Sequence, residues 1–371
     1  EPCLAAEARS FAALLAEQNP NPQPCARGPD RGLRAGQLLD FCARFQHFIR
    51  DRTMYYVVGS IVHPVTAPAQ LSYVELAGPV PTQWFVSHFW GHQFAELCIS
   101  IEKHAQVVEA VKRATPWRDT AYWICSFSNN QHRVREELGR DWSESSFYLA
   151  LRSPGVQGTC LIVDERALPL TRSWCLFEVA QTIQFEDEAD AGDGSSMRSV
   201  SSGRRGGVFF CTRSGIVNEG QAAVDVSMGL AKRMVALRLE DASASNPDDQ
   251  AQIHRFIRTR MGGFEKMNRC IRERIARALG TAESVAMANF ASIKSALAAS
   301  GDGQDGPASA RPSSSSGVGA LGHDPGSPGS LHSSIASGLS ASSTDPGLQR
   351  SSQRGTDYKT DGQRQRQADR R

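Results

Sequence analysis

The stretch from Gly158 to Phe185 constrains this chain more than any other part of it. It opens with a short apolar run, Thr159–Val163, which contains β-branched residues and is followed by an acidic pair. That pattern is typical of a strand buried on both faces. Pro169 and Thr171 then indicate a turn and an N-cap, so we expect a helix to begin near Arg172.

Glu178 is the only carboxylate between Trp174 and Ala180, in a helical segment that is otherwise apolar on all sides. Helices of that kind are normally buried. An unpaired charge in such a place costs several kcal/mol or more. The sequence therefore leaves three environments for Glu178: it is neutralised, it is paired with His88 or an arginine, or it faces a cavity.

Apolar runs alternate with helical patterns along most of the chain, which predicts an α/β fold with a doubly wound parallel sheet of about five strands. The expected strands are Trp84–Ser87, Tyr122–Cys125, Thr159–Val163, Val208–Cys211 and Met234–Leu239. The expected helices are Phe94–Lys112, Phe147–Leu151, the segment beginning near Arg172, Gly220–Leu230, Ile253–Arg258 and Phe264–Leu279.

Three regions follow from this pattern. Residues 1–80 form an N-terminal extension, residues 81–280 form the α/β domain with a flexible insertion at 186–207, and residues 281–371 form a frayed helix and then a disordered tail rich in Ser, Gly and Pro. Within the extension we expect helices at Leu4–Leu15 and Gln37–Ile49, a linker at Asn19–Asp30, and a strand or extended arm at Met54–Val62.

Composition excludes several functional classes. The 371-residue chain has a formal net charge of +2, so it lacks the basic field expected of a nucleic-acid-binding protein. Its nine cysteines include no Cys-x-x-Cys pair, which favours a reducing compartment, and we expect a cytoplasmic protein. No apolar stretch reaches the length of a membrane span.

Polar residues follow the expected strands at one edge of the sheet. Ser87 and His88 end the first strand, a turn containing Asn129 and His132 follows the second, and an acidic pair follows the third. In a doubly wound sheet, ligands bind beyond the carboxyl ends of the strands. The topology therefore predicts that these residues lie near the start of the helix that carries Glu178.

Three motifs at this edge are similar to those of Toll/interleukin-1 receptor (TIR)-type domains. They are Val86-Ser87-His88-Phe89-Trp90-Gly91, Asn130-Gln131-His132 and Arg172-Ser173-Trp174-Cys175-Leu176-Phe177-Glu178. The set resembles the divergent TIR-like domains of protists in particular, over roughly Thr82 to Leu279. The Trp-Cys-Leu-x-Glu piece is the most specific part. The resemblance implies a flavodoxin-like fold.

The resemblance also implies an activity. TIR domains that are enzymes cleave the nicotinamide–ribose bond of NAD with one glutamate, in a Trp-Cys-x-x-Glu setting that matches Glu178. The residues expected to bind substrate are Ser87, His88, Trp90, Asn129, His132 and Trp174. NAD or a related nucleotide would be the substrate, and no separate cofactor is implied. The chain departs from the family in the Arg- and Glu-rich segment Arg133–Phe147 and in the insertion at 186–207.

A non-catalytic TIR-type module in signalling, which associates with itself or with other TIR-like domains, is the alternative. Other interpretations of single residues stay open: Ser87 as a backbone cap, Trp174 as core, and Asn129 and His132 as partners of the turn's own backbone. We expect no metal at His88 and His92, because Gly91 places them in a turn and no third ligand is evident. Cys175 lies in an apolar helix, where a raised pKa opposes a nucleophilic role.

Overall fold

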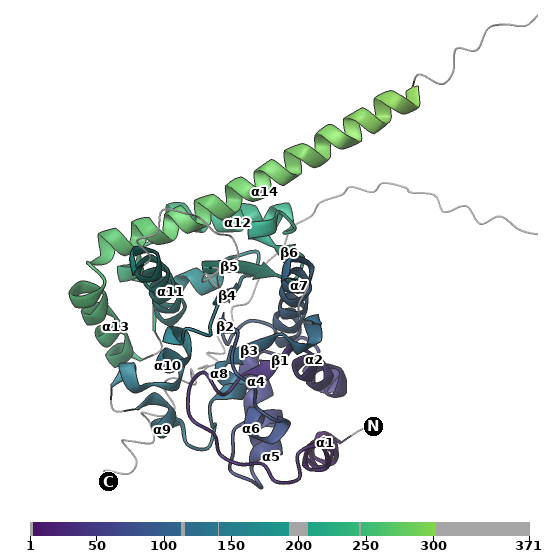
Figure 1. Cartoon of the computed structure of the whole chain (residues 1–371), viewed down its shortest axis with the longest axis vertical. Helices are drawn as coiled ribbons and strands as arrows, with labels where there is room; N and C mark the ends of the chain where they lie inside the picture. The colour runs from purple at the N-terminus through teal and green to yellow at the C-terminus, as the bar shows by residue number, and fades with distance from the viewer. Residues whose placement is uncertain (1–2, 113–115, 140, 193–206, 245, 302–371) are drawn as a thin grey trace, which may run out of the picture. The chain divides into compact units, whose positions relative to one another are not determined.

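The computed structural model describes residues 3–112, 116–139, 141–192, 207–244 and 246–301, and it shows an α/β fold built around one mixed sheet (Figure 1). The six strands lie in the order β1-β3-β2-β4-β5-β6. Their bounds are β1 Leu33–Arg34, β2 Trp84–Ser87, β3 Ala121–Ile124, β4 Gly158–Ile162, β5 Gly207–Thr212 and β6 Gly215–Ile216. The four central strands are parallel, as predicted, and all of them begin within two residues of the expected positions.

The prediction of a wholly parallel sheet is wrong at both edges. β1 pairs antiparallel with β3, and β6 pairs antiparallel with β5. β6 follows β5 after a two-residue turn, in which Thr212 Oγ1 donates to the carbonyl oxygen of Gly215 at 2.7 Å. A connection that short joins only antiparallel strands, because parallel strands need a crossover of a dozen or more residues.

The fifth strand predicted at Met234–Leu239 is also wrong. Helix α12 (Val224–Val235) runs into this segment, and a 3-10 turn, η6 (Leu239–Asp241), follows. The backbone of the segment is bonded by helix α14 (Phe264–Gly301) instead of by a strand: Leu239 N donates to Asn268 Oδ1 at 2.9 Å, and Arg272 donates to the carbonyl oxygen of Leu237. The segment is apolar because Leu237 and Leu239 are buried in the core, and not because it forms a strand.

The N-terminal segment is helical. Its elements are α1 Leu4–Gln18, α2 Ala35–Arg44, α3 Gln46–Ile49, α4 Met54–Val57, the π-helix η1 Val58–Val62, α5 His63–Thr66 and α6 Tyr73–Ala77. The helix predicted at Leu4–Leu15 is confirmed, the one predicted at Gln37–Ile49 is divided at Phe45 into α2 and α3, and the strand or arm at Met54–Val62 is wrong. Buried Met54, Val57, Ile61 and Val65 recur every three or four residues, which is the helical period.

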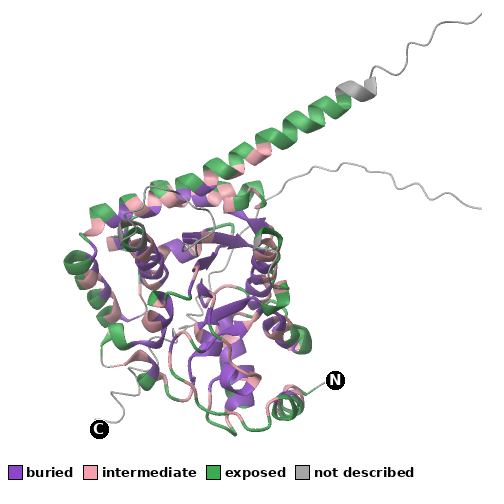
Figure 2. Cartoon of the chain, viewed as in Figure 1, coloured by how far each residue is buried: buried purple, intermediate pink, exposed green. Residues whose placement is uncertain are grey.

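Two hydrophobic clusters cover the two faces of the sheet. One joins the N-terminal helices and α7 (Phe94–Lys112) to the sheet, and the other joins it to α10 (Ser146–Arg152), α11 (Ser173–Gly192), α13 (Pro247–Arg260) and α14. Figure 1 shows α7 and α11 on opposite sides of β2, β4 and β5, and Figure 2 shows the buried residues concentrated on the strands and the inner helix faces. Residues before Val80 thus form part of the packing of one face.

Helix α11 begins at Ser173, close to the predicted start, but Thr171 is not its N-cap. Thr171 ends the 3-10 turn η4 (Leu168–Thr171), and its hydroxyl donates to the carbonyl oxygen of Leu168. α11 continues to Gly192, so the first residues of the predicted 186–207 insertion are helical. Glu186 is fixed there by an ion pair with Arg274 at 3.0 Å. The rest of the insertion, residues 193–206, lies outside the described residues.

The helix expected after Leu279 is confirmed, because α14 continues to Gly301. The chain divides into two compact units. The first includes residues 1–291 and contains the sheet and the candidate site. The predicted Ser-rich tail, residues 302–371, lies outside the described part of the chain. None of the helices in the described ranges combines the length and the apolar character needed to cross a bilayer.

Candidate functional site

The sheet brings Ser87 and Glu178 together, although 91 positions separate them in the chain. Ser87 is the last residue of β2, and its Oγ donates a hydrogen bond to Glu178 Oε2 at 2.6 Å. Ser87 is 0% exposed and Glu178 is 5% exposed. A short bond between a hydroxyl and a carboxylate in a buried place is among the stronger hydrogen bonds in proteins. It fixes the direction in which the Glu178 carboxylate points.

A second set of contacts fixes the helix turn that carries Glu178. Thr182 Oγ1 donates to the carbonyl oxygen of Glu178 at 2.9 Å, and it lies 2.6 Å from Thr159 Oγ1 on β4. Cys175, Leu176, Phe177, Val179 and Ala180 around Glu178 are all buried. The prediction that the helical segment around Glu178 is buried is therefore confirmed, and β2 and β4 together position the Glu178 carboxylate.

The strand order gives this place a special role in the fold. From β2 the chain crosses to β3 on one side, and it then returns to β4 on the other side of β2. Ser87 is paired in register with Leu161 of β4, so it stands at the carboxyl edge where the order reverses. In open α/β sheets this switch point is where ligands bind.

The turn after β3 is held mainly by its own backbone. Gln131 Nε2 donates to the carbonyl oxygens of Cys125, Ser126 and Asn129 at 3.0–3.1 Å. His132 contacts the N-terminal segment: its Nε2 lies 2.8 Å from Thr66 Oγ1, and its ring lies 4.1 Å from that of His63. Gln131 therefore satisfies backbone groups of the turn, whereas these contacts of the His132 side chain lie in the N-terminal segment and not in the turn.

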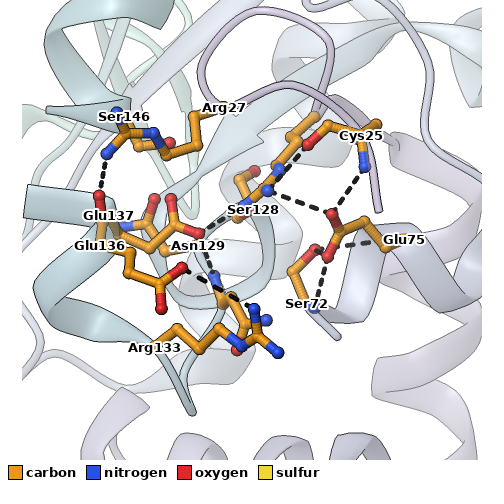
Figure 3. Close-up of polar contacts among 12 residues, drawn as sticks. Cys25, Arg27, Ser72, Glu75, Ser128, Asn129, Arg133, Glu136, Glu137 and Ser146 are labelled. Carbon is orange, nitrogen blue, oxygen red and sulfur yellow. Dashed lines mark hydrogen bonds and ion pairs between the residues drawn. The ribbon is translucent and has the colours of Figure 1, made fainter. Parts of the chain in front are cut away.

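A buried ionic cluster links this turn to the N-terminal extension (Figure 3). Arg31 forms ion pairs with Glu75 at 3.1 Å and with Glu137 at 2.5 Å, and the three side chains are 7%, 1% and 3% exposed. Glu137 Oε1 also accepts from the backbone N of Asn130. Arg31 donates to the carbonyl oxygen of Cys25 at 2.9 Å. The Arg31 cluster, defined by Arg31, Glu75 and Glu137, thus ties the extension to the turn.

The electrostatics of the Arg31 cluster favour its charged form. Burial by itself lowers the pKa of Arg31, but the carboxylates of Glu137 and Glu75 outweigh it and raise that pKa above the ordinary value. Arg31, Glu75 and Glu137 were not predicted as site residues from the sequence. One signal was present: Ser72-Tyr73-Val74-Glu75 has the capping-box spacing, and Ser72 N and Oγ both donate to Glu75 Oε2 at 2.7 Å.

The two predicted tryptophans lie in packed surroundings. Trp90 is buried, donates from Nε1 to Cys125 Sγ at 3.2 Å, and contacts the ring of Tyr55 edge-on. Trp174 is half-buried, packs against Phe147, and donates to Asp249 of α13 at 3.1 Å. Both rings therefore pack against other side chains of the protein, which agrees with the interpretation of Trp174 as a core residue.

The two histidines that follow β2, His88 and His92, lie in different surroundings. His88 is 8% exposed and follows Ser87 directly. His92 Nε2 lies 2.8 Å from Glu96 Oε2, one helical turn further along the chain. This pairing gives His92 a local partner at the start of α7.

The described residues form a pocket away from this edge. Its volume is about 1030 Å³, and Trp142, Tyr148, Arg255 and Phe256 are among the residues that line it. None of the seven predicted site residues lines this pocket. Ser87 and Glu178 are both buried, and this pocket is lined by residues of α10, α11 and α13 and of the segment before α10.

No family model, no curated protein and no solved structure matches this chain. The resemblance to TIR-type domains therefore stays a prediction.

Proposed function

We propose that the chain is a TIR-like domain that hydrolyses NAD at the nicotinamide–ribose bond, with Glu178 as its catalytic residue. The buried Ser87–Glu178 hydrogen bond at the sheet's switch point carries this proposal. Strand order supports it: the parallel strands β3-β2-β4-β5 follow the first four positions of the flavodoxin-like order 2-1-3-4-5.

One carboxylate suffices for this reaction because of the leaving group. Glycosidases use a second carboxyl group as an acid that protonates the leaving oxygen. Nicotinamide leaves NAD as a neutral molecule from a cationic ring, so no proton donor is needed there. NAD and water then give ADP-ribose, nicotinamide and one proton. Glu178 stabilises the positive charge that develops on the ribose, in a site from which bulk water is excluded.

The proposal requires the site to open, because Glu178 is 5% exposed. Phe89 lies two residues after Ser87, and Arg172 lies just before α11. The Arg172 guanidinium carbon lies 5.2 Å from the centroid of the Phe89 ring, so a cation–π contact joins the two segments that flank the Ser87–Glu178 bond. We assign the opening to separation of these two side chains, whose contact is worth only about 0.5–2 kcal/mol.

The test is nicotinamide release from NAD by concentrated purified protein. Glu178→Gln keeps the shape of the side chain and removes its charge, and we expect it to lower turnover about 10²–10³-fold. Glu165→Gln is the matched control, since Glu165 is an exposed acid shortly after β4 at the same edge. Equal turnover by wild type and Glu178→Gln would refute the catalytic role.

A non-catalytic interaction module is the second candidate, and one observation favours it. Glu178 is 5% exposed and does not line the described pocket, as expected of a side chain that only holds the fold together. In this case Glu178 anchors α11 to β2, and the domain acts by association with other copies or with other TIR-like domains. Sedimentation at rising protein concentration, with and without NAD, separates the candidates: oligomers without NAD binding or turnover identify the module.

A further inference from the structure

A cluster of potential metal ligands lies on the face of the sheet opposite α11. His104 of α7, Cys160 of β4 and Cys211 of β5 each offer one ligand atom, and these three atoms lie within 4.8 Å of one another. All three residues are 0% exposed. Ligands arranged trigonally at about 2.3 Å from one ion lie about 4 Å apart, so the cluster is close to binding geometry as it stands.

The Tyr122 hydroxyl orients the His104 imidazole. His104 Nδ1 lies 2.8 Å from the hydroxyl oxygen of Tyr122 on β3. The ring lies in an aromatic surround, with centroids 4.6 Å from Trp84 and 5.3 Å from Phe209. In metal sites a histidine almost always bonds its second ring nitrogen to such a partner, which sets the tautomer and the orientation of the ring. This arrangement assigns Nε2 of His104 to the metal.

We propose that His104 Nε2, Cys160 Sγ and Cys211 Sγ bind one thiophilic d10 metal ion. Thiolate ligands select Cu(I) and Zn(II) over harder ions. Structural zinc sites almost always have four ligands, and this cluster supplies three among the described residues. Three ligands in an apolar surround therefore make Cu(I) the expected ion. Binding displaces the thiol protons, which pass to solvent, and no electron is transferred.

Burial determines when the ion enters. A site with no exposed ligand cannot load through the folded surface, so binding accompanies folding. The bound ion would join α7 to β4 and β5, whose packing already forms one face of the core.

The experiment refolds the full chain anaerobically in reductant with one equivalent of Cu(I) or of Zn(II), followed by elemental analysis. We expect one Cu(I) per chain in wild type. In Cys160→Ser and Cys211→Ser we expect this retention to be lost. Cys175→Ser, which removes a buried thiol from α11 in the other cluster, should keep it. X-ray absorption should show one nitrogen and two sulfur ligands.

Tyr122→Phe keeps all three ligands and removes only the hydroxyl that bonds His104. We expect it to weaken Cu(I) binding about 10–100-fold in competition with a chelator, an effect that a purely packing role would not produce. This variant keeps the test decisive if the serine variants fail to fold. Stoichiometric Zn(II) retention that depends on the same two cysteines would support the site and reassign the ion. No retention of either ion by folded wild type would overturn the proposal.

Discussion

Removing Arg31 should destabilise the protein far more than removing an arginine at its surface. Arg31→Met deletes the cation that two buried carboxylates share, Glu75 and Glu137, which are 1% and 3% exposed. Breaking a buried ion pair by removing one partner costs about 3–5 kcal/mol, because a charge is left unpaired. Two carboxylates lose their partner here, so we expect a value at the upper end of that range.

The matched control is Arg133→Met, in the same region of Figure 3. Arg133 pairs with Glu136 at 3.8 Å, but the two side chains are 58% and 68% exposed. An exposed pair of this kind contributes about 0–1 kcal/mol. Urea unfolding at pH 7 measures both variants, with the midpoint reporting stability and the slope reporting whether the unfolding transition is the same.

A triple variant tests the stated cause. Adding Glu75→Gln and Glu137→Gln to Arg31→Met removes the unpaired charges, and it should recover part of the lost stability. A loss in Arg31→Met no larger than in Arg133→Met would refute the reasoning. A triple variant less stable than Arg31→Met would also refute it, since the cost would then not come from buried unpaired charge.

Three further predictions concern single positions. Ser87→Ala removes the donor to Glu178 and should cost about 1.5–3 kcal/mol in urea unfolding, the value for a hydrogen bond to a charged group; an unchanged midpoint would contradict this. Burial and a neighbouring imidazole lower the pKa of His132, so stability should fall as pH drops below about 6.5, and His132→Gln should lessen that fall between pH 7 and 5. An equal fall in both would contradict the assignment. Gly229→Ala drives a methyl group into a backbone carbonyl and should lower the thermal midpoint, whereas Gly280→Ala in open space should raise it; similar shifts would contradict the packing.

The central strands could be predicted because their signal is local. Apolar runs such as Thr159–Val163 are short, β-branched and bounded by a glycine and polar residues, and buried parallel strands have that pattern wherever they occur. The run at Met234–Leu239 has a similar pattern, but its backbone partners are Asn268 and Arg272. Those partners lie about thirty residues away, so tertiary contacts decide this segment and a local pattern cannot.

The candidate site was predictable only in part, for the same reason. Topology alone placed Ser87 and Glu178 at one edge, because both follow from strand order. His132 was expected to join them, but its partners come from α5 of the extension, in a segment that the sequence analysis assigned no fold. The Arg31 cluster and the His104–Cys160–Cys211 cluster each unite residues from three separate segments of the chain, which no spacing in the sequence reveals.

The most direct test of the account is a crystal structure with a carbocyclic NAD analogue, in which the bond to nicotinamide cannot be hydrolysed. The account predicts density at the carboxyl edge between β2 and β4, with the sugar-like ring beside the Glu178 carboxylate and the Arg172–Phe89 contact opened. Density confined to the pocket beside Trp142 and Phe256, with the Ser87–Glu178 bond intact, would contradict it.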